Sequence, residues 1–428
     1  MTLTFYCLFI LVFFFSFSKI KFHEPKGIFV LGAFFYIVFG MSNTLPVIAG
    51  DIDIPNELRI AIVIAFTPLL LLRKKSYTNN KKKKFRISNF SIKMIRNLAL
   101  IIGYLGFVYT LKKLGGFNAF SVNPNRVLRN QLITESGGNF PYSLFLYIGF
   151  TSSLLYEFYK GSDVKKIFLR SFIFLSPLLL YNLFEGERSN ILKFLFIAFF
   201  FYTIKIKHQK FKLNTIKLVL ISIGFIIFSI IGNVRSYLNL AMANRDSTIL
   251  TSAISDRGFF ELIVPNEPKA VAFTWRYTHR LLDNGKLDYK YGYTYFQGLT
   301  YFFPTTIFTI LDLKKDKTIS DKIGEMYAYE YGINKRVGFG YLGISELYLN
   351  FGLISCLFFF PIFFTLISVI ENQVYRNKTL FEIVAVTFLP YITFFTHRVS
   401  FASVLSGYIW FLVIVFGLFF ISKILKST

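Results

Sequence analysis

The sequence predicts an all-α protein, a helical bundle that crosses a membrane about eleven times and carries one large loop on one side. Three observations predict it. The 428 residues are 54% hydrophobic and 20% aromatic, more than the core of a soluble domain requires. The apolar residues lie in runs of about 17–22, the length of a helix that crosses a bilayer. Basic residues gather in the short segments between these runs, which is typical of a polytopic membrane protein.

The first apolar run has no basic residues before it and no small-residue cleavage pattern after it. It is therefore predicted to be a span and not a signal peptide. The predicted spans lie near 2–18, 27–48, 57–72, 95–111, 141–159, 167–183, 190–204, 215–232, 347–370, 380–396 and 402–422.

The distribution of lysine and arginine predicts one orientation. The run Lys81–Lys84 marks its connection as cytoplasmic, and the connection at 50–57 carries only negative charge and is expected outside. Alternation then places the N-terminus outside and the C-terminus in the cytoplasm. It also makes four further connections cytoplasmic, at 19–26, 160–166, 205–212 and 371–378.

Two outside segments are longer than turns, 112–140 and 233–341. Long ordered loops usually carry function. The chain is therefore divided into an N-terminal membrane bundle (1–232), a large outer loop (233–341) and C-terminal membrane helices (342–428). Within the loop, residues 299–311 are apolar but too short to span, so they are expected to lie in the interface or to re-enter.

The net charge of +25 first suggests a nucleic-acid partner. We reject that interpretation because much of the charge sits in short loops, where orientation and attraction to membrane lipid explain it. Cys7 and Cys356 both lie inside apolar runs, so neither a disulfide framework nor a thiolate metal site is expected. No phosphate-binding glycine loop and no metal-ligand spacing is present, so no cofactor and no metal are predicted.

Arginines recur at the predicted outer ends of spans and in the large outer loop. Each has a simpler alternative, such as a solvated turn or a side chain that snorkels to the interface. Several guanidinium groups at one membrane face suit a phosphate ligand, because the planar fork donates paired hydrogen bonds to phosphate oxygens. If 273–281 is helical, Arg276 and Arg280 share one face. The candidate pyrophosphate-binding residues are Arg188, Arg235, Arg276, Arg280 and Arg398.

Three residues are candidate proton acceptors. Glu346 precedes the ninth span and is expected to pair with a nearby arginine, either as a structural ion pair or as a catalytic base. His279 lies between Arg276 and Arg280, and imidazole titrates near neutral pH without special tuning. His397 is the third candidate, and we favour Glu346 over His279 because a helix start positions a side chain rigidly.

Three motifs resemble those of the Wzy-type O-antigen and capsule repeat-unit polymerases of bacteria: EGERSN (185–190), GYLGISELYLNFG (340–352) and THRVS (396–400). The many spans and the one dominant outer loop also resemble this family. The resemblance implies a multi-pass protein of the bacterial inner membrane that joins undecaprenyl-pyrophosphate-linked oligosaccharides at the periplasmic face. It implies catalytic roles for Glu346 and His279, and pyrophosphate binding by the five arginines. The implied partners are the lipid-linked donor and acceptor, with a flippase and a chain-length regulator.

Two rival functions remain. An O-antigen ligase would use the same donor with a different acceptor. A transporter or flippase of lipid-linked sugars would perform no chemistry and should carry charge at mid-membrane. Lys193 is the main charge inside a predicted span, and most other charges cluster at one face, which favours an enzyme.

Overall fold

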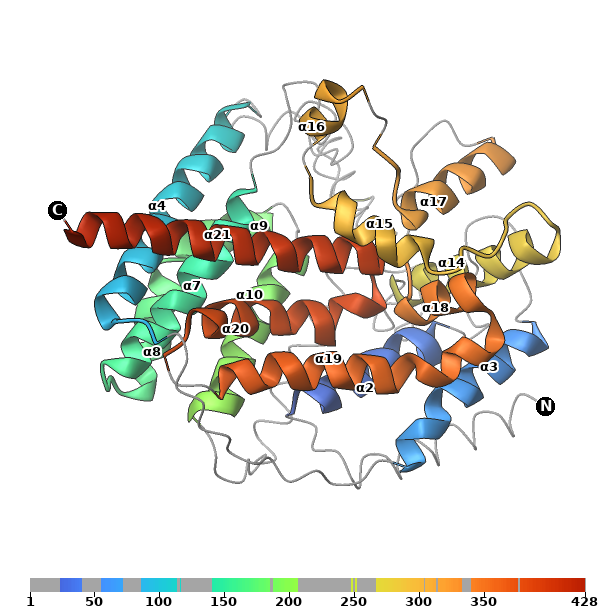
Figure 1. Ribbon diagram of the computed structural model, residues 1–428, viewed down its shortest axis with the longest axis horizontal. Helices are drawn as coiled ribbons and strands as arrows, with labels where there is room; N and C mark the ends of the chain where they lie inside the picture. The colour runs from blue at the N-terminus through green and yellow to red at the C-terminus, as the bar shows by residue number, and fades with distance from the viewer. Residues whose placement is uncertain are drawn as a thin grey trace. The chain divides into compact units, whose positions relative to one another are not determined.

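The computed structural model describes most of the chain (Figure 1). It describes residues 24–40, 55–71, 86–113, 116, 141–184, 188–206, 248, 251, 267–303, 305–312, 315–332, 340–375 and 378–427. Within these ranges the secondary structure is helical, apart from one isolated β-bridge between Arg86 and Thr379. Five helices within the described ranges are long and apolar enough to cross a membrane, which is consistent with an all-α membrane protein. They are Asn89–Lys113, Ser189–Ile206, Leu353–Val374, Leu380–His397 and Phe401–Lys426.

The prediction of eleven spans is only partly tested by these helices. The first and eighth predicted spans, 2–18 and 215–232, lie outside the described residues. Of the other predicted spans, 141–159 coincides with the helix Tyr142–Tyr159, which has 18 residues but is less apolar than the five. The described parts of 27–48, 57–72 and 167–183 coincide with shorter or interrupted helices.

Contacts divide the chain into two compact units. Unit 1 comprises 1–86, 203–205 and 267–413, and unit 2 comprises 87–202, 206–266 and 414–428. This division follows packing, whereas the predicted three-part division follows the sides of the membrane and stays a prediction.

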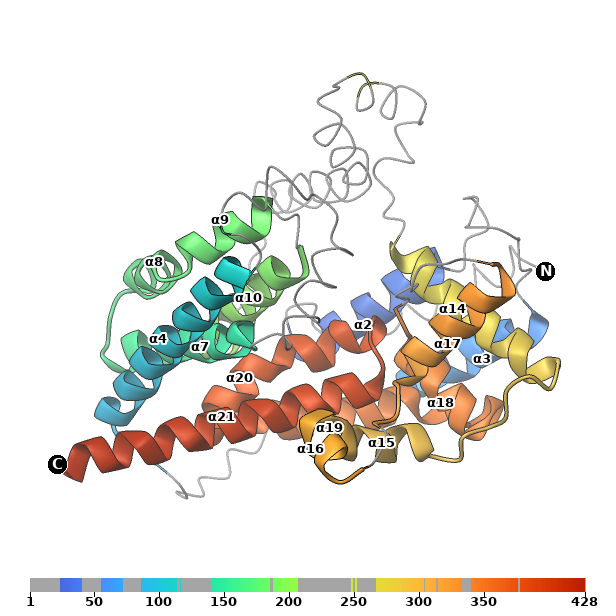
Figure 2. The same cartoon turned by 90° about the horizontal axis from the view of Figure 1, so that it is seen from above.

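In unit 2, α4 packs along α7, which also contacts α8 and α10 (Figure 2). Two glycines allow the close approach of α4 and α7. A Cβ on Gly103 would lie 2.7 Å from Leu146 Cδ2, and one on Gly149 would lie 2.8 Å from Leu100 Cδ2. Small residues at such crossings are typical of membrane helices. The helices of this unit are α4 (Asn89–Lys113), α7 (Tyr142–Tyr159), α8 (Val164–Ile173), α9 (Ser176–Phe184) and α10 (Arg188–Phe201), followed by the π-helical η4 (Tyr202–Ile206), of which 203–205 count with unit 1.

The predicted span 167–183 is interrupted between α8 and α9. Pro177 has no N–H, so it cannot donate to the carbonyl of Ile173 as an uninterrupted helix would require. The Ser176 hydroxyl donates to that carbonyl instead at 2.9 Å. The Tyr104 hydroxyl of α4 donates to the next carbonyl, that of Phe174. The carbonyls of Ile173 and Phe174 at this interruption therefore both accept side-chain hydrogen bonds.

Unit 1 holds the N-terminal helices and the helices from residue 267 onward. They are α2 (Pro25–Phe34), η1 (Phe35–Phe39), α3 (Asn56–Phe66), η2 (Thr67–Leu71), α14 (Glu267–Asp283), α15 (Tyr293–Tyr301), α16 (Thr305–Ile310), α17 (Ile319–Glu330), α18 (Gly343–Phe351), η5 (Leu353–Phe358), α19 (Phe359–Val374), α20 (Leu380–Thr393), η6 (Phe395–His397) and the first part of α21 (Phe401–Ser427).

The predicted outer loop contains α14 to α17. The apolar segment 299–311 is not one helix, because it comprises the end of α15 and all of α16. An apolar and aromatic core joins α14, α17 and α18, with fully buried Tyr277, Ile323, Tyr327 and Tyr341 at its centre. This core sets α14 beside α18.

The predicted ninth span, 347–370, is also interrupted. Gly352 has φ 74° and ψ −166°, a conformation that residues other than glycine rarely adopt, and α18 ends there. The nine residues of α18 are too few to cross a bilayer. Glu346 therefore lies on a short helix that precedes the candidate span Leu353–Val374.

Candidate functional site

Unit 1 contains five of the seven predicted site residues. Arg276, His279 and Arg280 lie on α14, Glu346 lies in the first turn of α18, and Arg398 follows η6. Of the remaining two, Arg188 begins α10 in unit 2, with its side chain outside the described part. Arg235 lies outside the described residues altogether.

The two motifs around Glu346 and Arg398 meet in space. The amide of Tyr341 donates to the carbonyl of Arg398 at 3.0 Å. The amide of Phe401 donates to Oε2 of Glu346 at 2.6 Å. Two hydrogen bonds therefore join the start of GYLGISELYLNFG to Arg398 of THRVS, and its glutamate to Phe401, the residue that follows THRVS.

Glycine makes this meeting possible. A Cβ on Gly340 would lie 2.5 Å from Val271 Cγ2 of α14 and 2.9 Å from the carbonyl oxygen of Arg398. The Thr274 hydroxyl of α14 donates to the Gly340 carbonyl at 3.0 Å. Gly340 therefore allows three segments to pack closely.

Glu346 is completely buried. Its Oε1 forms no hydrogen bond within the part of the chain that the structure describes, so the expected arginine partner is replaced by the Phe401 amide on Oε2. Burial raises the pKa of Glu346 to about 7, and the Phe401 amide and the Thr294 hydroxyl, which favour the charged form, only partly offset it. The group thus changes protonation near neutral pH, as a general base should.

Asn350, one turn after Glu346, fixes the neighbouring helix. Its Nδ2 donates to the Glu346 carbonyl and to the Thr294 hydroxyl, both at 2.7 Å. Its Oδ1 accepts the amide of Gly292 at 2.9 Å, where φ is 88°. The asparagine of the LYLNFG motif therefore holds the turn that starts α15 beside Glu346.

His279 belongs to a second cluster, which the sequence did not reveal. Its Nε2 lies 3.1 Å from Oε2 of Glu57 on α3, and Oε1 of Glu57 accepts the Tyr348 hydroxyl at 2.7 Å. The rings of His279 and Tyr348 stack with centroids 5.9 Å apart. A carboxylate so placed orients the imidazole, as in other acid–base pairs. The only sequence signal for Glu57 was the purely acidic loop that it ends.

Arg276 and Arg280 lie on one helix four residues apart, as predicted, but they contact different acceptors. Arg276 is buried, and its Nη2 donates to the Gly40 carbonyl at 3.2 Å. Arg280 donates to Glu330 at 2.8 Å and to the Tyr331 hydroxyl at 3.3 Å. Binding of an anion by Arg280 would therefore compete with Glu330.

His397 is enclosed by packing. Its Nε2 lies 2.9 Å from the Phe29 carbonyl, and because a carbonyl oxygen only accepts, this nitrogen carries the proton. The ring contacts Phe29 and Phe359, with centroids 4.5 and 6.1 Å away, and it is almost fully buried. These contacts suit a structural histidine between α2 and η6.

The described residues contain no group of three or more His, Cys, Asp and Glu side chains that could hold a metal ion. No family model, no curated protein and no solved structure matches the chain at a significant level. The candidate site consists of three features. They are a buried carboxyl with one oxygen unpaired among the described residues, a histidine–glutamate pair, and arginines on α14 and after η6.

Proposed function

We propose that this chain is a membrane glycosyltransferase that lengthens a glycan by joining oligosaccharide units carried on undecaprenyl pyrophosphate. One observation carries the proposal. GYLGISELYLNFG and THRVS, two segments that resemble the repeat-unit polymerases, are joined by the hydrogen bond from Tyr341 to the Arg398 carbonyl, and the buried carboxylate of Glu346 binds the amide of Phe401 directly after THRVS.

In the proposed reaction the acceptor sugar hydroxyl attacks the anomeric carbon of the donor. The new glycosidic bond forms as the bond from that carbon to the pyrophosphate oxygen breaks. The hydroxyl proton passes to Glu346, whose unpaired Oε1 can accept it, and undecaprenyl pyrophosphate leaves with the bonding electrons. Such base assistance is typically worth about 10²–10⁴-fold in rate.

The arginines would bind the leaving group. Negative charge gathers on the pyrophosphate as the bond breaks, and fixed guanidinium groups stabilise it without reorganisation. Among the candidate arginines, Arg398 is connected to the segment of Glu346 by a hydrogen bond. Its carbonyl accepts the amide of Tyr341, five residues before Glu346.

The contacts agree with the predicted sidedness. Glu57 and His279, both predicted outside, are in contact. Lys205 and Glu382, both predicted at cytoplasmic ends of spans, form a buried ion pair. Each pairing supports a common membrane side for its two partners.

The test uses the purified full-length protein in proteoliposomes with an undecaprenyl-pyrophosphate-linked oligosaccharide. We expect longer lipid-linked glycans and release of undecaprenyl pyrophosphate, with activity unchanged in EDTA. Arg398→Lys should be severely impaired, because a point charge cannot replace the guanidinium fork.

The outcomes separate the rival functions. Glycan transfer only when a lipid A core acceptor is added would indicate a ligase. Movement of the lipid-linked sugar across the bilayer with no new glycosidic bond would indicate a flippase and contradict the proposal.

A further inference from the structure

We propose that unit 2 binds the phosphate of an anionic phospholipid at Arg96, at the Asn89 end of α4. This inference is independent of the proposed glycosyl transfer, because every residue that it uses lies in unit 2.

Arg96 stands where a lipid phosphate is accessible. It is the eighth residue of the candidate span Asn89–Lys113, about 10 Å along the helix from Asn89. The 25 residues of this helix exceed the roughly 20 that cross the hydrocarbon, so Arg96 falls near one edge of the apolar layer. The charge pattern predicts this edge to be cytoplasmic, where bacterial and other membranes present anionic headgroups.

The contacts of Arg96 leave its charge without a neutralising anion. Its Nε and Nη2 both donate to Oδ1 of the adjacent Asn97, at 3.0 and 2.9 Å. Its guanidinium lies over two rings, 4.9 Å from the centroid of Tyr156 and 5.6 Å from that of Phe174. Among the residues described here, no carboxylate pairs with Arg96. The two rings orient the cation and screen it on their side, but they do not neutralise it.

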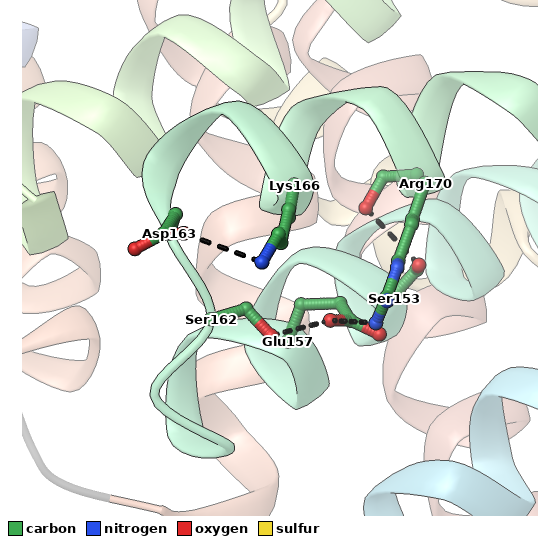
Figure 3. Close-up of polar contacts among 7 residues, drawn as sticks. Ser153, Glu157, Ser162, Asp163, Lys166 and Arg170 are labelled. Carbon is green, nitrogen blue, oxygen red and sulfur yellow. Dashed lines mark hydrogen bonds and ion pairs between the residues drawn. The ribbon is translucent and has the colours of Figure 1, made fainter.

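The buried carboxylate that follows Tyr156 in the sequence already accepts hydrogen bonds from other residues. Glu157, next to Tyr156 on α7, accepts Arg170 Nη1 at 3.0 Å and the Ser162 hydroxyl at 2.6 Å on the same oxygen (Figure 3). Asp163 pairs with Lys166 at 3.4 Å on the exposed surface. Both acidic residues of this region therefore have basic partners of their own.

Arg96 has a basic neighbour on its own helix. Lys93 lies three residues before it on α4, on the same side of the helix. The Tyr104 hydroxyl of α4 donates to the Phe174 carbonyl, so α4 contacts residue 174 through its backbone as well as through the ring below Arg96. The guanidinium donors that do not bind Asn97 can bind an anion.

A phosphodiester is the group that fits this arrangement. Guanidinium binds phosphate oxygens through paired hydrogen bonds, and the exposed apolar side chains of Leu169 and Ile173 on α8 suit acyl chains. Basic pockets between membrane helices at a cytoplasmic face bind anionic headgroups in this way.

Native mass spectrometry of the full-length protein, with dioleoylphosphatidylglycerol titrated in detergent, tests the site. Arg96→Gln should bind this lipid about tenfold more weakly than the wild type, the loss expected for one charge-assisted hydrogen bond. Lys423→Gln is the matched control, because Lys423 is exposed over one ring at the end of α21 and its loss should leave binding unchanged. Dioleoylphosphatidylcholine, whose phosphate is paired with its own choline cation, should lose less affinity on Arg96→Gln than dioleoylphosphatidylglycerol does.

Equal phosphatidylglycerol affinity of wild type and Arg96→Gln would overturn the proposal. So would Arg96-dependent binding of inorganic phosphate with no Arg96-dependent binding of the lipid, because the source would then be a free anion. If Arg96→Gln is not monodisperse, Phe174→Leu keeps the charge and removes one ring, and it should weaken lipid binding by a few fold. No weakening in that variant would also contradict the site.

Discussion

Two buried glutamates, one in each unit, are held in contrasting ways. Glu157 in unit 2 is 4% exposed, and one of its oxygens accepts an arginine and a serine. Glu346 in unit 1 is fully buried, and it accepts one backbone amide while its other oxygen is unpaired among the described residues. The basic partner of Glu157 offsets part of the cost of burying its charge, whereas the unpaired oxygen of Glu346 adds to that cost and can act on a ligand. The difference favours Glu346 as the functional glutamate.

Separate substitution of the two glutamates should give the largest difference in activity. Glu346→Gln should lower glycan lengthening by about 10²–10⁴-fold, because an amide cannot accept the hydroxyl proton. Product length is measured in proteoliposomes that contain equal amounts of each protein.

Glu157→Gln is the matched control. It should lower the free energy of unfolding by about 1–3 kcal/mol, because Arg170 loses a charged partner. The activity per folded protein should be nearly unchanged. Long glycans from Glu346→Gln at normal membrane levels would leave Glu346 with a structural role only.

The pH dependence should carry the signature of Glu346. Since its pKa is raised to about 7, the carboxylate that accepts a proton disappears below that pH, and activity should fall about tenfold per pH unit. The stability of the protein should change with pH in the opposite direction to its activity. The neutral acid is favoured in the folded state, so its contribution is complete below about pH 4.5 and is lost as pH rises through about 7.

Both effects are measured against Glu346→Gln from pH 5 to 9, as initial rates and melting temperatures. A wild-type melting temperature that rises relative to this variant between pH 5 and 8 would contradict the assignment.

Glu57 offers a smaller and sharper test of the second cluster. Glu57→Gln should reduce activity about tenfold, because His279 loses its orienting charge-assisted hydrogen bond. Tyr348→Phe is the control, since it removes the hydroxyl on Glu57 and keeps the contact with His279. An equal loss in both variants would indicate a packing effect and not a role for the histidine–glutamate pair.

The smallest expected effect concerns packing at Gly340. Gly340→Ala should destabilise the protein by about 1–3 kcal/mol, because the new methyl group would press on Val271 and on the Arg398 carbonyl. Gly407→Ala on α21 has no atom within 4 Å of the added Cβ and should be neutral or slightly stabilising. Differential scanning of both proteins in the same detergent compares them, and similar melting temperatures would mean that the segments around Gly340 can separate.

The sequence predicted some of these features because they are local. Apolar length identified the five described helices that could cross a membrane, whereas the sequence left open whether Arg276 and Arg280 lie on a helix, which the structure shows. Composition windows could not show the interruptions at Gly352 and Pro177, because a turn of apolar residues looks like a continuous span.

Contacts between distant segments could not be predicted. Glu57 and His279 are 222 positions apart, and nothing in either local motif specifies the other. For the same reason we expected an arginine beside Glu346, where the structure has the amide of Phe401. Charge complementarity suggested the partner, but the close approach at Gly340 brought a backbone donor instead.

The amide that binds Glu346 belongs to the first residue of α21, the longest helix described, with 27 residues. The first amides of a helix have no partner inside it, and an acceptor there also interacts with the positive end of the helix dipole. Here that acceptor is a side chain 55 positions earlier, on another helix. Protonation of Glu346 would remove its negative charge from this end, so the capping of α21 depends on the proton that the site holds.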